Sequence, residues 1–214
     1  RDKETIQSLV SDISHQVKTP IANTKMFTGI LRKHQLPKEK QAEFLATMEG
    51  QIDKLDFLMQ SLIKMSRLET GTFTLHMEEA SLSDTIARAM SVVWAKAEEK
   101  EIQLFAECDS FVTVKHDPKW TAEALGNILD NAVKYTPFGG SVRVSVRPWQ
   151  FYTRVDITDT GIGIPEEHYN DIFQRFYRAQ EVAAQEGVGL GLYLANGIIT
   201  RQKGYISVKS KVGE

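Results

Sequence analysis

Residues 1–68 carry apolar or neutral residues at alternating steps of three and four, the spacing of helices that pack side by side. In the first stretch these positions are Ile6, Val10, Ile13, Val17, Pro20, Thr24, Phe27 and Leu31, and in the second they are Phe44, Leu45, Met48, Ile52, Leu55, Met59 and Leu62. Between them, residues 33–37 read as a turn, because Pro37 suits the start of a new helix. The pattern predicts two long amphipathic helices in an antiparallel hairpin.

A single hairpin of this kind leaves much of both apolar rows uncovered. Pairing two hairpins into a four-helix bundle buries both rows. Since most soluble oligomers are built from identical chains, we expect a homodimer.

His15 lies two residues past Ile13, roughly 200° around the helix from the apolar row. The imidazole is therefore expected to face solvent, close to Pro20, which can bend the helix. An exposed imidazole on a rigid bundle can be presented to another active site. On this helix alone, an ordinary surface histidine is the simpler interpretation.

Residues 118–135 have the apolar stripe of a helix. Asn127 and Asn131 are four residues apart and share one helix face, with Lys134 one turn further along. Mg²⁺ prefers oxygen ligands, and a lysine adds positive charge for phosphate. Taken alone, the asparagine pair is more typical of a solvated helix face.

Residues 159–165 follow a predicted strand and contain Asp159, Gly161 and Gly163. Glycines permit a close backbone approach that side chains would block. A carboxylate at such a turn can accept a hydrogen bond from an exocyclic amine such as that of adenine. A simple strand-to-helix turn explains these five residue positions equally well.

A second glycine-rich segment, residues 187–192, precedes an apolar helix predicted at 193–200. Backbone N–H groups at the start of a helix form an anion site, since they and the helix dipole point at the ligand. A single Gly-x-Gly-x-Gly pattern is weak evidence for a phosphate site. The asparagine pair, the Asp-x-Gly-x-Gly turn and this pattern, in that order along the chain, are strong evidence together.

The whole set resembles the cytoplasmic catalytic portion of a two-component sensor histidine kinase. Five segments match the family's motifs in order: the phosphoacceptor box at 14–20, the N box at 127–137, the first glycine box at 159–165, the F box at 173–178 and the second glycine box at 187–192. The likeness covers essentially the whole chain.

The resemblance implies an α+β fold: a helical hairpin forming a dimeric four-helix bundle, then a two-layer α/β sandwich of the gyrase and histidine kinase ATPase type. The expected domains are a dimerisation and phosphotransfer hairpin at 1–70 and an ATP-binding domain at 71–214, joined by a linker at 69–72. The pattern further predicts helices at 81–100 and 118–135 and strands near 73–77, 102–106, 112–114, 142–146, 155–157 and 205–208.

The activity implied by the resemblance is autophosphorylation of His15 from ATP and transfer of the phosphoryl group to an aspartate of a response regulator. The implied cofactors are ATP and Mg²⁺, with Mg²⁺ held by Asn127 and Asn131. The implied ATP-binding residues are Asn127, Asn131, Lys134, Tyr135, Asp159, Gly161, Gly163, Gly187, Gly189, Leu190 and Gly191.

Arg175 or Arg178 is expected to stabilise charge on the γ-phosphoryl group. Residues 178–186 correspond to the family's mobile lid over the nucleotide. Their Ala, Gln and Glu content gives little apolar anchoring.

The chain departs from the family pattern next to the phosphoacceptor. Gln16 stands where Glu or Asp is common; it cannot take a proton, so we expect it only to orient the imidazole. Thr19 matches a position that, in some members of the family, places a water for dephosphorylation of the regulator. The resemblance therefore implies a possible second activity, that of a phosphatase acting on the regulator.

Three alternative functions are therefore kept open. The chain is an active histidine kinase, an ATPase or serine-directed kinase of the same nucleotide-binding superfamily in which His15 is incidental, or a dimerisation scaffold with a degenerate ATP site. Labelling with γ-labelled ATP separates them.

Composition agrees with the kinase interpretation. A net charge of −2 gives no basic footprint for nucleic acid. The single cysteine excludes an internal disulfide framework and suits a reducing compartment. Neither a membrane-spanning apolar run nor a signal peptide is visible. Because the chain begins at Arg1, we expect an excised fragment whose sensor and membrane segments lie upstream. Because the family usually continues beyond residues 211–214 into a turn and a last strand, we also expect a short C-terminal piece to be missing. The resemblance implies the cytoplasmic portion of a bacterial membrane sensor.

Overall fold

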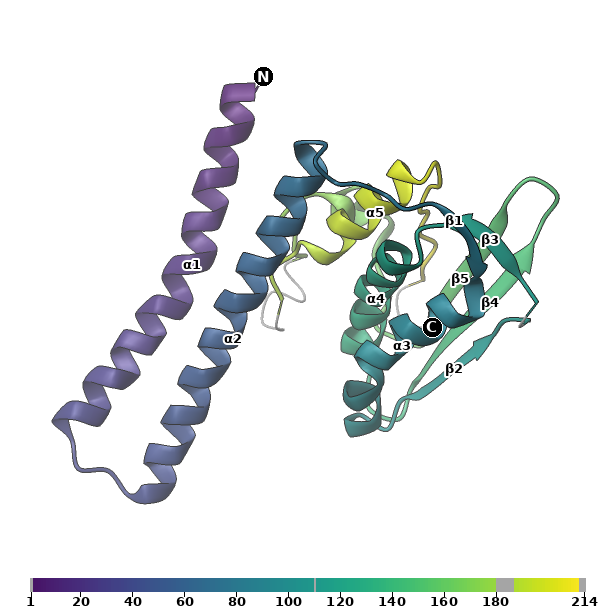
Figure 1. The fold of residues 1–214 in the computed structure, drawn as a ribbon. Helices are drawn as coiled ribbons and strands as arrows, with labels where there is room; N and C mark the ends of the chain where they lie inside the picture. Colours follow the sequence, from purple (N-terminus) through teal and green to yellow (C-terminus); the bar gives the residue numbers. More distant parts are fainter. Residues whose placement is uncertain (1, 110, 180–186, 212–214) are drawn as a thin grey trace. The chain divides into compact units, whose positions relative to one another are not determined.

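The computed structural model describes residues 2–109, 111–179 and 187–211, and the chain divides into two compact units. One unit comprises Arg1–Lys64 and Gln185–Val188, and the other comprises Met65–Ala184 and Gly189–Glu214. Figure 1 shows the helices and strands of both. Among the described residues, no helix combines the length and apolar character that a membrane span requires.

The first unit is the expected helical hairpin. Helix α1 spans Asp2–Lys33 and continues through Pro20, and helix α2 spans Lys38–Glu69. The two run antiparallel (Figure 1). Phe27 and Phe44 connect them, with ring centroids 5.0 Å apart. The last turn of α2, from Met65 onward, belongs to the second unit.

Three helices of the second unit begin and end close to the predicted positions. They are α3 (Leu82–Glu99), α4 (Pro118–Tyr135) and α5 (Gly191–Arg201). Ser81 caps α3 by accepting the Asp84 N–H at 3.2 Å, and Asp117 caps α4 by accepting the Trp120 N–H at 2.9 Å. Side-chain oxygens at these positions satisfy backbone donors that have no partner inside the helix.

The strands form two small sheets. Strand β1 (Glu78–Ser81) pairs antiparallel with β3 (Thr113–His116). In the other sheet, β4 (Ser141–Pro148) lies between β2 (Gln103–Glu107), to which it is parallel, and β5 (Thr153–Asp159), to which it is antiparallel. Two short 3₁₀ helices, η1 (Glu166–His168) and η2 (Asp171–Phe173), follow.

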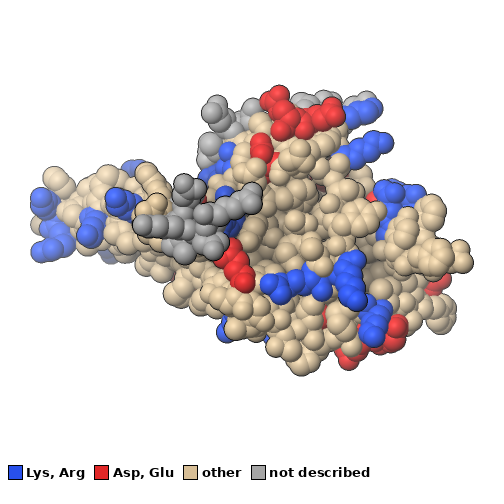
Figure 2. Space-filling view, turned by 90° about the horizontal axis from the view of Figure 1, so that it is seen from above, with Lys and Arg blue, Asp and Glu red and all other residues tan. Residues whose placement is uncertain are grey.

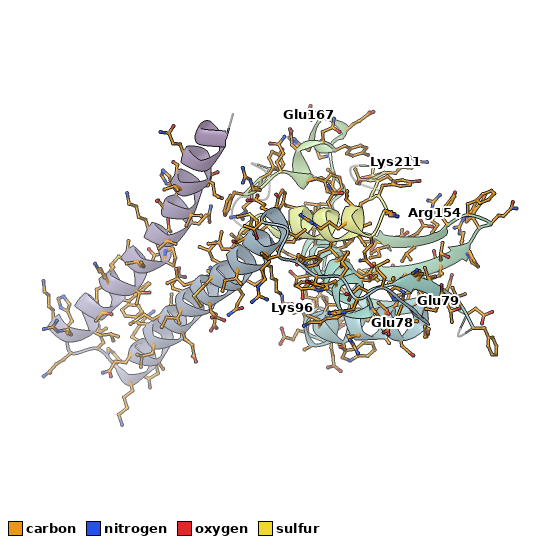
Figure 3. All side chains as sticks on the ribbon, turned by 45° about the horizontal axis from the view of Figure 1, so that its top comes forward. Glu78, Glu79, Lys96, Arg154, Glu167 and Lys211 are labelled. Carbon is orange, nitrogen blue, oxygen red and sulfur yellow. The ribbon has the colours of Figure 1, made fainter. Side chains whose placement is uncertain are left out.

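The core of the second unit lies between α3, α4 and the larger sheet (Figure 1). Val142 and Val144 of β4 are almost completely buried, as are Val93 of α3 and Leu129 of α4. Charged residues lie outside it: Glu78 and Glu79 of β1 are exposed (Figure 3). This arrangement confirms the predicted two-layer α/β sandwich.

Two predicted strands and the start of the linker were wrong. Residues 73–77 form no strand, because Phe73 packs its ring on Trp120, 4.2 Å between centroids, and the His76 N–H donates to Asp117 Oδ2 at 2.8 Å. Residues 205–208 are also not a strand. Glu69 is the last residue of α2 and not part of a linker.

Candidate functional site

His15 lies on α1 with its side chain exposed in the single chain. Thr19, one turn further along the same helix, is also exposed, and Gln16 is partly buried. The prediction that the imidazole faces solvent is confirmed. An exposed neutral imidazole keeps a ring nitrogen lone pair available as a nucleophile.

At the centre of the second unit, Asn127 of α4 lies against the first residue of α5. Its Nδ2 donates to the Glu123 carbonyl at 3.1 Å, and its Oδ1 is 3.3 Å from the position that a Cβ on Gly191 would occupy. Glycine at this position lets the asparagine oxygen approach the helix start closely. Among the described residues, no side chain caps α5. The first-turn N–H groups of a helix have no partner inside the helix, and such a helix start is a place where an anion can bind.

The C-terminal end of α4 meets the first glycine-rich turn. The Tyr135 carbonyl accepts the Ile162 N–H at 3.3 Å, and Asp159 Oδ1 accepts the Gly161 N–H at 2.9 Å. A Cβ on Gly161 would lie 2.6 Å from Asp159 Oδ1 and 2.9 Å from the Tyr135 carbonyl oxygen. Only glycine allows this approach. The turn holds the exposed Asp159 carboxylate at the end of β5.

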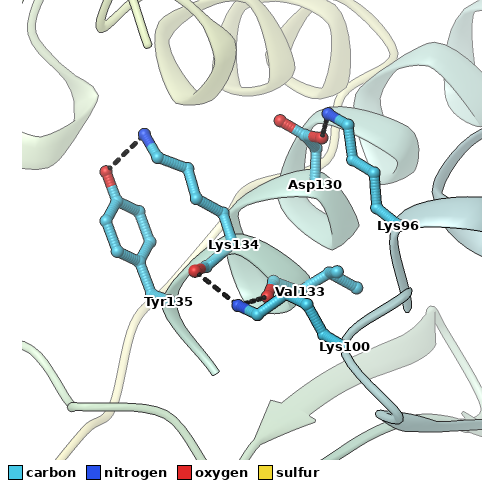
Figure 4. Close-up of polar contacts among 6 residues, drawn as sticks. All are labelled: Lys96, Lys100, Asp130, Val133, Lys134 and Tyr135. Atoms are coloured by element: carbon cyan, nitrogen blue, oxygen red, sulfur yellow. Dashed lines mark hydrogen bonds and ion pairs between the residues drawn. The ribbon is translucent and has the colours of Figure 1, made fainter. Parts of the chain in front are cut away.

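Between these two ends, α4 presents Asn131 and Lys134, both partly buried. Lys134 Nζ lies 3.0 Å from the Tyr135 hydroxyl and 4.6 Å from the centre of its ring (Figure 4). Eight residues separate Asn127 from Tyr135, about 12 Å along a helix. The site is therefore a strip along α4, with a place for an anion at one end and a carboxylate turn at the other.

The second glycine-rich segment adopts backbone conformations that favour glycine. Gly189 has φ of +77°, and a Cβ there would lie 2.7 Å from the Tyr177 carbonyl. The Gly189 carbonyl accepts the Phe176 N–H at 2.9 Å, which joins this segment to the F box. Gly187 and Gly163 also have positive φ, and Leu190, just before α5, is fully buried.

Two family models match the chain. Residues 5–71 match the His Kinase A (phospho-acceptor) domain, and residues 116–214 match the histidine kinase-, DNA gyrase B- and HSP90-like ATPase. The chain belongs to the sensor histidine kinases.

Curated relatives agree with this histidine kinase assignment. Drug sensory protein A of Synechocystis sp. is 30% identical over 98% of the chain and 34% of its own length, and sensor protein kinase PmrB of Pseudomonas aeruginosa is 26% identical over 96% and 43%. The chain thus spans about a third to a half of these relatives.

The fold resembles that of Acinetobacter baumannii histidine kinase AdeS, with a TM-score of 0.76, 22% identity and 92% of each chain covered. It also resembles histidine kinase ThkA in complex with response regulator protein TrrA, with a TM-score of 0.79, 20% identity and coverage of 99% of this chain and 60% of that one.

In this histidine kinase, Arg175 is engaged by Glu69. Arg175 Nη1 lies 3.2 Å from Glu69 Oε1, which also accepts the Tyr193 hydroxyl at 3.0 Å. Burial, and then the hydrogen bond to Glu69, raise the pKa of Tyr193 above its ordinary value. Arg178 is partly buried. The predicted lid lies outside the described residues from position 180 to 186.

The sequence interpretation missed Glu69 and Lys100. Glu69 was assigned to a linker, whereas it holds Arg175. Lys100 donates to three backbone carbonyls at the end of α4. Arg175 is more than a hundred residues away from Glu69 in the sequence, and the partners of Lys100 are backbone carbonyls more than thirty residues away. No sequence pattern indicates either partnership, so neither role was visible from the sequence.

Proposed function

We propose that the chain transfers the γ-phosphoryl group of ATP to a ring nitrogen of His15 and then to an aspartate of a response regulator. The observation that carries this is the strip along α4, where Asn127 meets the start of α5 and Tyr135 meets the Asp159 turn. The chain pairs that strip with an exposed histidine in a phosphoacceptor domain. Residues 1–70 serve dimerisation and phosphotransfer, and residues 71–214 serve ATP binding.

ATP lies along α4 in this proposal. The Asp159 carboxylate accepts from the adenine amine, and Tyr135 packs on the base or ribose. Lys134 contacts the phosphates, while backbone N–H groups of the segment from Gly187 to Gly191, including Leu190, bind them. Gly161 and Gly163 shape the turn below the base.

Asn127 and Asn131 suit a Mg²⁺ ion bound with the nucleotide. The support is Asn127 Oδ1, which lies close to Gly191 where phosphate oxygens would gather. Mg²⁺ takes few protein ligands and keeps several waters. Its contribution is to neutralise phosphate charge.

At His15, a ring nitrogen lone pair forms a bond to the γ-phosphorus as the bond to the β-phosphate oxygen breaks. ADP leaves, and the ring N–H proton is released to solvent. Gln16 cannot act as a base, so its role is to orient the ring. Donation of the phosphoryl group to the regulator restores His15.

A guanidinium stabilises charge on the transferring group. Arg178 and Arg175 are the candidates from the F box. Since Arg175 is paired with Glu69, that ion pair has to open before Arg175 can contact ATP. In this proposal Thr19, which is exposed one turn after His15, positions a water that dephosphorylates the regulator.

The partners in this proposal are a second copy of the chain and a receiver domain. Dimerisation is supported by an exposed apolar row on α2, formed by Leu45, Ile52 and Met59 at intervals of seven residues. Because the phosphoryl donor is ATP, we place the chain in the cytoplasm, attached to a membrane through segments outside it. Basic and acidic side chains are scattered over the face seen in Figure 2, as suits a protein without a nucleic-acid partner.

The test is incubation of the purified chain with γ-labelled ATP and Mg²⁺. We expect an acid-labile, alkali-stable label that disappears in His15→Asn and persists in His34→Asn, an exposed histidine just after α1. Asn127→Ala and Asp159→Asn should also abolish labelling. Acid-stable label in His15→Asn would instead identify a hydroxyl-directed kinase, and absence of both label and ATP binding would identify a scaffold.

A further inference from the structure

We propose that Lys100 is a positioning residue for ATP binding, through an ammonium group that closes the C-terminal end of α4. The proposal rests on the proposed function above, because α4 is the helix along which ATP is placed. Lys100 itself belongs to neither the predicted motifs nor the ATP contacts.

A helix leaves its last four carbonyls without partners inside the helix. In α4, the Ala132 carbonyl accepts the Thr136 N–H at 3.0 Å, and the Tyr135 carbonyl accepts the Ile162 N–H at 3.3 Å. The other two, of Val133 and Lys134, both accept from Lys100 Nζ, at 2.8 and 2.9 Å (Figure 4). All four carbonyls are therefore satisfied, two of them by one side chain.

The same ammonium also donates to the Thr136 carbonyl at 2.5 Å. An ammonium has three N–H groups, so three acceptors use all of its donors. Its positive charge stands at the negative end of the α4 dipole. Burial lowers the pKa of Lys100, while the three carbonyls act in the opposite sense by binding the charged form.

The backbone of Lys100 joins the same structure. Its carbonyl accepts the Gly139 N–H at 2.9 Å, so Lys100 holds both the end of α4 and the turn that follows. This end of α4 carries the Lys134 and Tyr135 side chains and the carbonyl that contacts Ile162. Loss of the ammonium leaves two helix carbonyls without a donor and frees the last turn to shift or fray.

Lys96 supplies a matched control. It lies one turn before Lys100 on α3 and also reaches α4, through an ion pair of 2.5 Å with the Asp130 side chain. Both partners of this pair are exposed, 64% and 38%, and exposed pairs contribute little to stability. Lys96 lies in the last turn of α3 and Lys100 is the residue that follows this helix. Both side chains reach α4, but they bind different groups there.

The experiment compares Lys100→Met and Lys96→Met by calorimetric titration with ATP, well below the melting temperature of each variant. We expect Kd for ATP to rise roughly tenfold in Lys100→Met, equivalent to about 1.4 kcal/mol, and to stay within about twofold in Lys96→Met. The KM for ATP in autophosphorylation should rise while kcat at saturating ATP is retained. Lys100→Arg keeps the charge but replaces the compact three-way donor with a planar fork, and should fall between.

A second readout does not depend on ATP. Exchange of the Ile162 amide proton, followed by NMR, should accelerate in Lys100→Met and not in Lys96→Met. Unchanged ATP affinity and unchanged Ile162 exchange in folded Lys100→Met would overturn the proposal, as would equal effects in both variants. If the wild-type chain bound no ATP, the proposed function would fail, and Ile162 exchange would still decide whether Lys100 closes the helix. If Lys100→Met does not fold, Lys100→Gln and Lys100→Arg provide the same comparison.

Discussion

At Gly161 the absence of a side chain lets two segments of the site touch. The Tyr135 carbonyl and the Asp159 carboxylate both lie closer to this residue than any real Cβ would allow. One of these neighbours is backbone at the end of a helix, so it cannot move aside as a flexible side chain would. A side chain added at Gly161 is therefore expected to change both the geometry of the candidate site and the stability of the fold.

We predict that Gly161→Ala destabilises the chain by about 1–3 kcal/mol and weakens ATP binding. Urea unfolding followed by circular dichroism measures the first effect and titration with ATP the second. The control is Gly126→Ala in α4, where the nearest atom to an added Cβ is the Ala89 carbonyl oxygen at 4.0 Å. Alanine there should leave stability unchanged or raise it by up to about 1 kcal/mol. Equal effects of the two substitutions would contradict the steric argument.

Tyr193 gives a pH prediction. Burial and the hydrogen bond to Glu69 raise its pKa, so the folded state holds the phenolic proton more tightly than the unfolded state. The resulting stability is fully present below the unfolded pKa of about 10 and is lost as pH rises through the higher folded value. The phenol of Tyr193 is measured as the difference between the alkaline absorbance titrations of the wild-type chain and of Tyr193→Phe. We expect this difference to appear above pH 10. A Tyr193 phenol that titrates at or below the ordinary value would contradict the raised pKa and the burial and hydrogen bond to Glu69 that cause it.

At the scale of elements, Asp117 joins two segments. Its Oδ1 accepts the Trp120 N–H and its Oδ2 accepts the His76 N–H, while only 2% of the residue is exposed. The side chain therefore caps α4 and fixes the extended segment before β1.

We predict that Asp117→Ala lowers the free energy of unfolding by about 2–3 kcal/mol, because the cap of α4 is lost and a second, partly buried donor, the His76 N–H, loses its acceptor. Ser81→Ala, which removes only the cap of α3, should cost about 1 kcal/mol. Denaturant unfolding of the two variants measures both. A loss in Asp117→Ala no larger than that in Ser81→Ala would show that the bond to His76 adds nothing.

Elements with a strong local signal were predictable. The bounds of α4 follow from its apolar period and from Asp117-Pro118, a cap followed by proline. The strand expected at 73–77 was not, because Phe73 and His76 take their partners from α4 and not from a neighbouring strand. Within the candidate site, the glycines and asparagines were predictable because they recur at the spacing of known motifs. The role of Lys100 was not, because the carbonyls that it binds come near it only in the folded chain.

At the scale of the whole molecule, the hairpin exposes apolar side chains that a single chain does not cover. Leu45 and Ile52 are each 56% exposed, and Met59 is 52% exposed. Their spacing of seven residues places them in one row along α2. Our proposal is that a second copy of the hairpin, which carries the same row, covers it.

We predict that Ile52→Glu converts a dimer into a monomer, because it places a charge in the centre of this row. Light scattering after size-exclusion chromatography measures the mass. The neighbouring exposed Asp53→Ala should leave the dimer intact. A dimeric Ile52→Glu would show that the row lies outside the interface, and a monomeric wild type would show that the chain does not dimerise through this row.

The backbone hydrogen bond between Phe176 and Gly189 offers a way to follow the second glycine-rich segment in solution. Phe176 has φ of +59°, a left-handed conformation that bulky residues adopt only when their surroundings enforce it. Its amide hydrogen is held by the carbonyl of Gly189, so the two segments keep their conformations jointly. We therefore expect the Phe176 amide proton to serve as an internal reporter, because its rate of exchange with deuterium depends on the conformation of the second glycine-rich segment.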